Sequence, residues 1–586
     1  MKSFLLSSCI LVIIFSCNSK KDKIAYDFET TFETSKGTET PTYNQVIAFY
    51  KSLAEAYPSI AMYEMGATDS GEPLHLMVFN PNRKTNNTLE SEFSDTENKN
   101  VLLINNGIHP GESDGIDASM LLLRDLAQEK IKVPQNTIIA VIPIYNIGGA
   151  LNRNSGTRTN QNGPKEYGFR GNARNYDLNR DFIKADTKNA QSFAEIFHLV
   201  QPDLFIDNHV SNGADYQYTL THLFTQHNKL GGDLGTYLHT SFMPQLEDSL
   251  AQKKWDITPY VNLFNRTPET GFSQFMDYPR YSTGYTTLFN TLGMMVETHM
   301  LKPYKQRVEG TYELMKTFIS IAEKDAALIQ KHRKNNEALY NPGNSYPISW
   351  TIDSTQAATL PFKGFEGTME PSKITGANRL QYHRDQPFTK PVTYYNEFKL
   401  VEEVVIPQAY IIPKGYWNVI ERLKNNAIEL TEVKNDTTIT AEVYTIKSYE
   451  TFKNPYEGHY PHYNTQVESF QETILVKEGD FIVFTQQSGI RYLIETLEPM
   501  AMDSFFNWNY FDTVLQQKEG FSPYVWEDMA VQFLEDHPEI KNQFDAKKTA
   551  EPNFASNWYA QLDWIHQQSP HYEKSFLRYP IVRVRD

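Results

Sequence analysis

A histidine and a glutamate stand three residues apart in the stretch HPGE, where His109 and Glu112 follow the apolar run NVLLINNG. A catalytic zinc ion usually takes three protein ligands from His, Glu and Asp and leaves one position for water. A close pair therefore needs a distant third ligand, and His209 in PDLFIDNHVS is the candidate. The alternatives are that Glu112 stabilises the start of a helix and that His209 is structural.

Two arginines and an asparagine stand close together in the stretch RGNARNYDLNRDF, which contains Arg170, Asn179 and Arg180. A guanidinium has a planar fork of donors that pairs with both oxygens of a carboxylate. The stretch therefore favours recognition of a carboxylate over the alternative of ordinary surface ion pairs.

A lone carboxylate interrupts the apolar run GMMVETH at Glu297. Burial of a carboxylate in such a run is costly unless the group has a partner or a task. Burial also raises the pKa of a carboxyl group toward the value of a useful general base.

The elements around these residues predict an α/β fold. Near-continuous apolar runs such as NVLLINNG, NTIIAVIPIYN and PDLFIDNHVS are typical of buried strands, and segments with helical periodicity lie between them. We expect a helix from Asn44 to before Pro58, two strands joined at Ser70-Gly71, and one long helix over 303–335. Residues 148–180 form a long loop of the kind that is usually either functional or disordered.

The pattern changes beyond about residue 344, where short alternating runs such as ITAEVYTIKSYE predict antiparallel strands. We therefore expect a first domain over 43–340 and a mostly β second domain over 341–586. One helix is predicted in the second domain, in YVWEDMAVQFLEDHPEIKNQF.

The N-terminal stretch MKSFLLSSCILVIIFSC has the form of a signal peptide over residues 1–16. Its end resembles the cleavage box of bacterial lipoproteins, which implies lipid on Cys17, a tether over 17–42, and a place in the bacterial cell envelope, in the periplasm or at the cell surface. Lipid would be the only membrane contact. The alternatives are an ordinary signal peptide or an uncleaved anchor.

Composition excludes several classes of protein. Both cysteines, Cys9 and Cys17, lie in the leader, so the mature chain has no thiol nucleophile and no cysteine ligand. The formal charge of −16 argues against a nucleic-acid partner, because phosphate contacts need a surplus of Lys and Arg.

The stretches HPGE, DLNRDF, DNH and VETH occur in the order and approximate spacing seen in the zinc carboxypeptidases related to carboxypeptidase A, and YEMGATDSGEPLHLMVF resembles that family's opening strands. The resemblance covers about residues 43–320. It implies a mixed twisted sheet with helices on both faces. It also implies one zinc ion per chain, bound by His109, Glu112 and His209.

The same resemblance implies roles for the other residues. Glu297 would be the general base, and Asn179 and Arg180 would hold the free C-terminal carboxylate of a peptide substrate. Arg170 would stabilise the oxyanion, with Arg174 as the competing choice.

A tyrosine on a mobile loop is also implied, and YPRYSTGYTTLFN offers Tyr281, favoured over Tyr278 and Tyr285. The floor of the specificity pocket would fall near the uncharged Leu288, which argues against a preference for C-terminal Lys or Arg. Gly111 departs from the relatives that have an arginine before the ligand glutamate, so one substrate contact is expected to be missing.

The leading hypothesis is thus a zinc metallocarboxypeptidase that hydrolyses the C-terminal peptide bond of peptides with metal-activated water. One alternative keeps the zinc chemistry but acts on the amide of peptidoglycan stem peptides or acylated amino acids. Another is an inactive lipoprotein that binds peptide or glycan.

Overall fold

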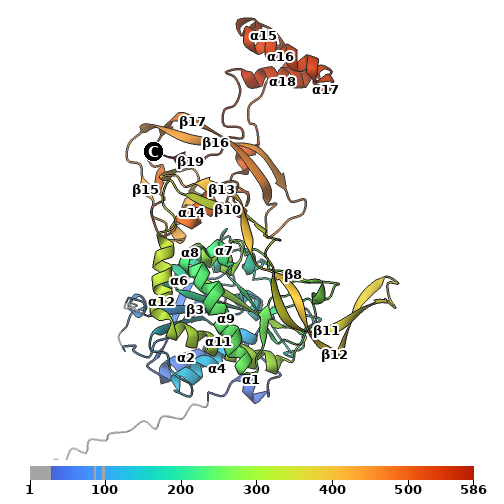
Figure 1. Ribbon diagram of the computed structural model, residues 1–586. Coiled ribbons are helices and arrows are strands. Elements are labelled where there is room, and N and C mark those ends of the chain that lie inside the picture. The colour runs from blue at the N-terminus through green and yellow to red at the C-terminus, as the bar shows by residue number, and fades with distance from the viewer. Residues whose placement is uncertain (1–27, 85–86, 95–98, 586) are drawn as a thin grey trace, which may run out of the picture.

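The computed structural model describes residues 28–84, 87–94 and 99–585 (Figure 1). The predicted signal peptide and Cys17 lie outside these residues. Within the described part of the chain, no helix combines the length and the apolar character that crossing a membrane requires.

The first half of the chain is built on an eight-stranded mixed sheet with the strand order β1-β2-β4-β3-β5-β9-β6-β7. Its centre is parallel, since β3 pairs in parallel with β4 and β5, and β5 with β9. Antiparallel pairs flank this centre: β1 with β2, β2 with β4, and β6 with β9. The strands are β1 (Ile60–Ala67), β2 (Pro73–Phe79), β3 (Asn100–Asn105), β4 (Thr137–Ile142), β5 (Leu204–Ser211), β6 (Leu220–Phe224), β7 (Ile257–Pro259) and β9 (Leu292–His299).

Helices cover both faces of this sheet. Consecutive residues of a strand point to opposite faces, and in β5 Asp207 accepts a hydrogen bond from Ser282 of α10, whereas Asn208 contacts Met315 of α11. Helices α10 and α11 therefore lie on opposite sides, as the predicted fold class requires. The main helices of this half are α2 (Tyr43–Ala56), α4 (Asp114–Ala127), α6 (Lys188–Val200), α9 (Met243–Gln252), α11 (Tyr304–Lys324) and α12 (Ala326–Glu337), and the short helix α10 spans Ser282–Thr287.

The predicted elements of this half are present, with one difference. Helix α2 begins with a capping box of Thr42 and Gln45 and ends before Pro58, as its sequence predicts. The single helix expected over 303–335 is two helices, because the chain leaves helical geometry at Asp325 between α11 and α12. The short elements are α1 (Thr31–Thr34), α3 (Leu89–Glu92), α5 (Ile147–Leu151), α7 (His227–Leu230), α8 (Gly232–Tyr237), a π-helical turn (Leu238–Phe242), and 3-10 turns at Leu178–Arg180 and Pro268–Thr270.

Residues 28–42, expected as part of the tether over 17–42, pack against the first half of the chain. Phe28 and Phe32 are buried, and Phe32 packs edge-on against Tyr304. The hydroxyl of Thr40 donates to Asp117 at 2.6 Å. Two buried aromatic rings and a buried hydrogen bond thus hold this polar segment against the first half.

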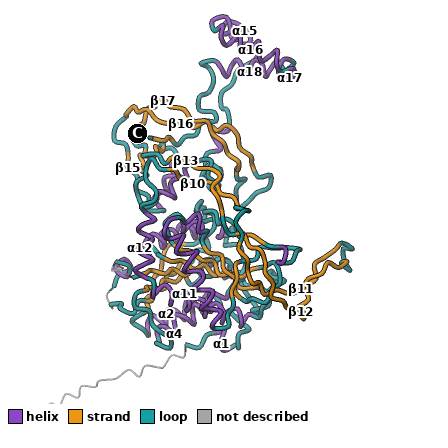
Figure 2. Tube along the Cα trace, viewed as in Figure 1, coloured by secondary structure: helices purple, strands orange, loops and turns teal. Residues whose placement is uncertain are grey.

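The second half is rich in strands, as predicted, and forms several sheets (Figure 2). Strands β10 and β13 form one pair, β11 and β12 form a long hairpin joined by β8 of the first half, and six strands form a sheet in the order β15-β18-β14-β19-β16-β17. The strands are β8 (Phe272–Ser273), β10 (Ser345–Ile352), β11 (Ala358–Pro371), β12 (Asn378–Tyr395), β13 (Phe398–Val405), β14 (Ala409–Ile412), β15 (Thr431–Glu432), β16 (Thr437–Thr451), β17 (His462–Val476), β18 (Phe481–Phe484) and β19 (Val582–Val584).

The helix predicted over 524–544 is two helices, α15 (Pro523–Asp536) and α16 (Pro538–Ala550), followed by α17 (Pro552–Ala555) and α18 (Trp558–Gln568). The break falls at His537-Pro538, because proline has no amide hydrogen and begins a helix rather than continuing one. These helices project from the far end of the molecule (Figure 1, red). Helices α13 (Trp417–Asn425) and α14 (Ile490–Leu497) lie within the second half, with a 3-10 turn at Asp512–Leu515.

The two halves share a hydrophobic core. Tyr492 of α14 stacks on Phe289 at 5.9 Å and meets the ring of Tyr285 edge-on at 6.5 Å, and one buried cluster contains residues from both halves. The hairpin β11–β12 buries Phe362 against Tyr218. The domain boundary expected near residue 340 falls between α12 and β10. The hydrophobic core nevertheless continues from the first half of the chain into the second.

Candidate metal centre and active site

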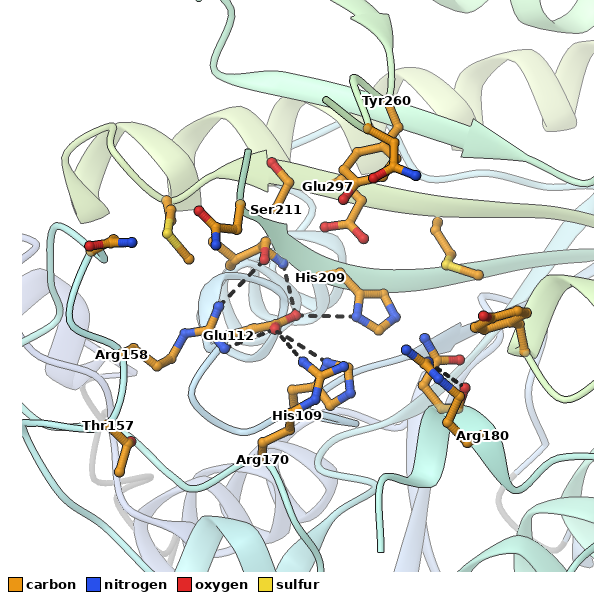
Figure 3. Close-up of a pocket in the computed structure, with 18 of the residues that line it drawn as sticks. His109, Glu112, Thr157, Arg158, Arg170, Arg180, His209, Ser211, Tyr260 and Glu297 are labelled. Atoms are coloured by element: carbon orange, nitrogen blue, oxygen red, sulfur yellow. Dashed lines mark hydrogen bonds and ion pairs between the residues drawn. The ribbon is translucent and has the colours of Figure 1, made fainter. Parts of the chain in front are cut away.

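Three side chains from two distant stretches meet at one point (Figure 3). His109 Nδ1 lies 3.2 Å from Glu112 Oε1, and His209 Nδ1 lies 3.2 Å from Glu112 Oε2. Each of the three residues is at most 4% exposed, and each offers one ligand atom within 4.8 Å of the others. His109 Nδ1 is buried and makes no hydrogen bond to any described residue. Two imidazole nitrogens and a carboxylate in this arrangement fit a zinc ion.

The sheet brings these residues together. Strand β3 pairs in parallel with β5, with Asn105 opposite Asp207, so the carboxyl ends of the two strands lie side by side. His109 and Glu112 follow β3 in a turn closed by the Glu112 amide donating to the His109 carbonyl at 2.8 Å. Binding sites of open α/β sheets lie in this position, outside the carboxyl ends of the strands.

Two aspartates hold the histidine rings from behind. Asp177 Oδ1 lies 2.9 Å from His109 Nε2, and Asp207 Oδ2 lies 2.9 Å from His209 Nε2. A carboxylate accepts the Nε2 hydrogen, which leaves the Nδ1 lone pair of each ring directed at the centre. Burial would raise the pKa of Asp177, but the hydrogen bond from His109 and the charges of Arg170 and Arg180 outweigh it, and the pKa lies well below its ordinary value.

Glu112 is held in its ionised form by its surroundings. Its carboxylate accepts hydrogen bonds from Arg158 Nη1 and the Val210 amide, both at 2.9 Å. Burial would raise the pKa of Glu112, yet the charge of Arg158 helps to bring it well below the ordinary value.

Arg158 fills the space beside Gly111. A Cβ atom added to Gly111 would lie 2.6 Å from Arg158 Cδ and 2.9 Å from the Gly168 carbonyl oxygen. No side chain fits at position 111 while Arg158 lies there. The sequence has no arginine directly before Glu112. Arg158, from a loop 46 residues further along the chain, places a guanidinium beside Glu112 in the cavity instead.

Glu297 lies directly across the sheet from His209, because β5 and β9 pair in parallel with these two residues opposite each other. Its carboxylate makes no hydrogen bond or ion pair to any described residue and faces the same cavity as the three ligands. Burial raises the pKa of Glu297 to about 7, opposed by His209 and reinforced by Glu112.

An open cavity of about 720 Å³ lies over this cluster. Its wall carries three arginines on a loop that is otherwise rich in Gly and Asn, namely Arg158, Arg170 and Arg180. Tyr260, Phe275 and Met295 add apolar surface. The cavity therefore suits an anionic ligand with an apolar portion.

Arg170 lies in this cavity and Arg174 does not line it. Arg170 Nη1 is 3.6 Å from Glu112 Oε1, and Asp177 Oδ2 holds its guanidinium through Nε at 3.0 Å and Nη2 at 2.9 Å. Arg174 instead lies over the ring of Tyr176 and 3.8 Å from Asp69. This geometry favours Arg170 for a role at the reacting centre.

The predicted substrate-binding residues also line the cavity. The guanidinium of Arg180 lies over the ring of Tyr281, 4.7 Å from its centroid. Asn179 Oδ1 accepts from the Ser282 amide at 3.3 Å, which links the Asn179 loop to the start of α10. Tyr285 is fully buried and donates to Asn426 at 2.6 Å, so it is not available to a substrate.

Leu288 does not form the pocket floor. It is fully buried in the core and does not line the cavity. The side chains that do line the cavity beside Tyr281 and Arg180 include Phe275 and Met295. The inference about substrate preference drawn from Leu288 therefore has no structural basis.

Residues 46–202 match the zinc carboxypeptidase family. The chain contains a zinc carboxypeptidase domain. Carboxypeptidase 2 of Trichophyton rubrum is 23% identical over 511 residues, covering 80% of this chain and 84% of that protein. An alignment of that extent includes part of residues 341–586, beyond the resemblance seen in the sequence. The chain is thus a metallocarboxypeptidase homologue.

Two solved structures are similar to about half of the chain at low identity. A metallo-carboxypeptidase from Burkholderia cenocepacia is 16% identical, with a TM-score of 0.36, covering 48% of this chain and 69% of its own. Carboxypeptidase A from Helicoverpa armigera is 15% identical, with a TM-score of 0.35, covering 48% and 74%.

The second half of the chain contacts loops that lie at this cavity. Glu457, between β16 and β17, accepts the Asp177 amide hydrogen at 2.8 Å. Asp503 accepts from the Arg280 amide and from Arg280 Nε, both at 2.8 Å, directly before Tyr281. Neither contact has a local signal in the sequence, because the partners lie more than 200 residues apart.

Proposed function

We propose that this protein is a zinc-dependent carboxypeptidase that removes the C-terminal residue of peptides. The observation that carries the proposal is the arrangement of one cavity: His109, Glu112 and His209 at its base, Glu297 opposite them, and Arg180 on its wall. This set combines a water-activating centre with a group that recognises a carboxylate.

The three ligand residues would hold zinc, which when bound polarises a carbonyl oxygen and lowers the pKa of water. Glu297 would take the proton from the attacking water and deliver it to the departing amine. Its free carboxylate and its raised pKa suit a group that must both accept and release a proton.

Arg180 and Asn179 would bind the terminal carboxylate of the peptide. Arg180 is only partly exposed, and its Nη1 donates to the Asn179 carbonyl at 2.9 Å. The carboxylate of Asp177 lies 4.0 Å from the same nitrogen, too far for a hydrogen bond, so the guanidinium has donors left for a substrate. A guanidinium in this position pairs well with a carboxylate. Tyr281, stacked on Arg180, would close against the bound residue.

Arg170 would stabilise negative charge on the carbonyl oxygen during attack. Asp177 fixes its guanidinium at the edge of the metal cluster, so the donors are already in place when charge develops.

A pair of matched peptides tests the proposal. A blocked dipeptide with a free C-terminal carboxylate is expected to be hydrolysed, and the same peptide with an amidated C-terminus to be hydrolysed at least about tenfold more slowly. Chelation is expected to stop the reaction and zinc to restore it.

Arg180→Met is the diagnostic variant. It is expected to raise KM for the free peptide by about 10–100-fold and to change the rate on the amidated peptide little, because only the carboxylate contact is lost. Equal loss on both peptides would contradict carboxylate recognition by Arg180. Consumption of muropeptides but of neither dipeptide would replace the peptidase with the amidohydrolase alternative.

The proposal also includes the subcellular location of the protein. The leader supports export to the cell envelope, with lipid on Cys17 as the anchor. Mass spectrometry of the mature N-terminus tests this, since a lipid-modified Cys17 is expected as the first residue.

The second half of the chain would support the catalytic loop from outside. Glu457 fixes the backbone of Asp177, and Asp177 in turn orients His109 and Arg170. Glu457→Ala is expected to lower kcat/KM and zinc affinity by about tenfold while the protein stays folded.

Glu450 provides a matched control on the same hairpin. Its carboxylate is exposed and accepts from Tyr463 and Asn464, away from the carboxypeptidase site. Glu450→Ala is expected to leave kcat/KM and zinc affinity unchanged. Equal values for the two variants would refute a positioning role for Glu457.

A further inference from the structure

A second group of metal-ligating side chains lies outside the active-site cavity. His227 is the first residue of α7, His239 belongs to the π-helical turn between α8 and α9, and Glu397 lies between β12 and β13. The proposed mechanism uses none of these residues, and none lines the active-site cavity.

The distances in this group match those of a metal site. His227 Nε2 lies 3.1 Å from Glu397 Oε2, and His239 Nε2 lies 3.6 Å from Glu397 Oε1. Ligand atoms around a tetrahedral zinc ion with bonds of about 2.0–2.1 Å are separated by about 3.3 Å. The corresponding distances in the carboxypeptidase site are both 3.2 Å.

The two imidazole rings are placed together with no hydrogen bond between them. They stack at 4.0 Å with an interplanar angle of 15°. The His239 ring makes no hydrogen bond to any described residue, and the carboxylate beside it is that of Glu397. A metal ion would give the Nε2 atoms of both rings a partner after a small rotation of the rings out of their parallel arrangement.

The carboxylate is already oriented. Asn228 Nδ2 donates to Glu397 Oε2 at 3.0 Å, and Asn228 Oδ1 accepts from the Phe398 amide at 2.9 Å. Gln226 Nε2 also donates to the Asn396 carbonyl at 2.7 Å. Hydrogen bonds of this kind fix ligating carboxylates in metal sites.

The local backbone of His239 is unusual as well. Helices α8 and α9 are joined by a π-helical turn over Leu238–Phe242, and His239 is its second residue. Single π turns inside helices occur frequently at functional sites. Here the turn presents His239 to the loop that carries Glu397.

We propose that His227, His239 and Glu397 bind a second divalent transition-metal ion, with zinc favoured by the two imidazoles and one carboxylate and with water in the remaining position. The ion would join the β12–β13 connection to the helices of the first half. This is a proposal about metal binding, and it does not depend on the peptidase activity.

The zinc content of the purified full-length chain tests this proposal. Protein stripped with a chelator, reloaded with zinc chloride and freed of excess metal is measured by elemental mass spectrometry. The wild type is expected to hold about two ions per chain, and His239→Gln and Glu397→Gln about one each. Peptide hydrolysis should persist in both variants, which shows that they fold.

Two further variants separate the sites. His332→Gln alters a histidine of α12 that lies near Asp233 of α8, outside both sites. This variant is expected to keep about two zinc ions per chain. His209→Gln is expected to lose only the active-site ion, and His209→Gln combined with His239→Gln to lose both. If His239→Gln and Glu397→Gln each bind as much zinc as the wild type, the second site is refuted, whatever the activity of the enzyme.

Discussion

Replacing Glu297 with glutamine is expected to lower kcat/KM by about 10²–10⁴-fold while the zinc content stays at the wild-type value. The glutamine keeps the size of the side chain but cannot accept the proton of the attacking water. Because Glu297 makes no hydrogen bond or ion pair to any described residue, its replacement leaves no buried partner unsatisfied. The fold and the metal ligands should therefore be unchanged.

The pH profile gives an independent check on the same residue. Burial raises the pKa of Glu297 to about 7, and a general base is active only when deprotonated, so kcat/KM should fall as the pH drops below that region. A bound divalent cation lowers the pH at which kcat/KM falls to half, because its positive charge favours the ionised carboxylate of Glu297. This acid limb should disappear from the residual activity of Glu297→Gln.

Glu309 is a suitable control, since it is exposed on α11 and pairs with Lys305 of the same helix. Glu309→Gln should have the rate and pH profile of the wild type. Turnover by Glu297→Gln at the wild-type rate would remove Glu297 from the mechanism, and loss of zinc from that variant would show that its effect acts through the metal site.

The elements that carry the site could be predicted from local sequence. Strands β3 and β5 are continuous apolar runs, and α2 has a capping box and a following proline, so composition and periodicity determine them. Elements that depend on distant contacts were missed. Phe28 and Phe32 order a polar segment only because a surface of the first half is there to receive them.

The residues of the site also divide into those that local sequence identifies and those that depend on distant contacts. His109, Glu112, His209 and Glu297 stand in short recognisable stretches, and the sheet brings them to one point. The groups that orient them depend on distant contacts: Asp177 stands in DLNRDF but meets His109 across 68 residues, and Arg158 meets Glu112 across 46. The role of Asp207 could have been found from local sequence, because Asp207 precedes His209 by two residues in a strand and so shares its face.

Replacing Arg170 with alanine is expected to lower kcat by about 10²–10³-fold with little change in KM. The guanidinium lies 3.6 Å from Glu112 Oε1 and is fixed by two contacts to Asp177, so its donors face the metal cluster rather than the Arg180 side of the cavity. Negative charge on the substrate oxygen grows only as the reaction proceeds. A donor at that position therefore stabilises the transition state more than the bound peptide.

Arg174 provides the matched control, because it belongs to the same loop, carries the same charge, and was the competing assignment. Its guanidinium lies over Tyr176 and near Asp69, outside the cavity lining. Arg174→Ala should thus change kcat less than about threefold. A larger loss for Arg174→Ala than for Arg170→Ala would transfer the role to Arg174, and a loss confined to KM in Arg170→Ala would make Arg170 a ground-state binding residue. Arg170→Lys should recover only part of kcat, since a single ammonium cannot keep both contacts to Asp177 and still donate to the substrate oxygen.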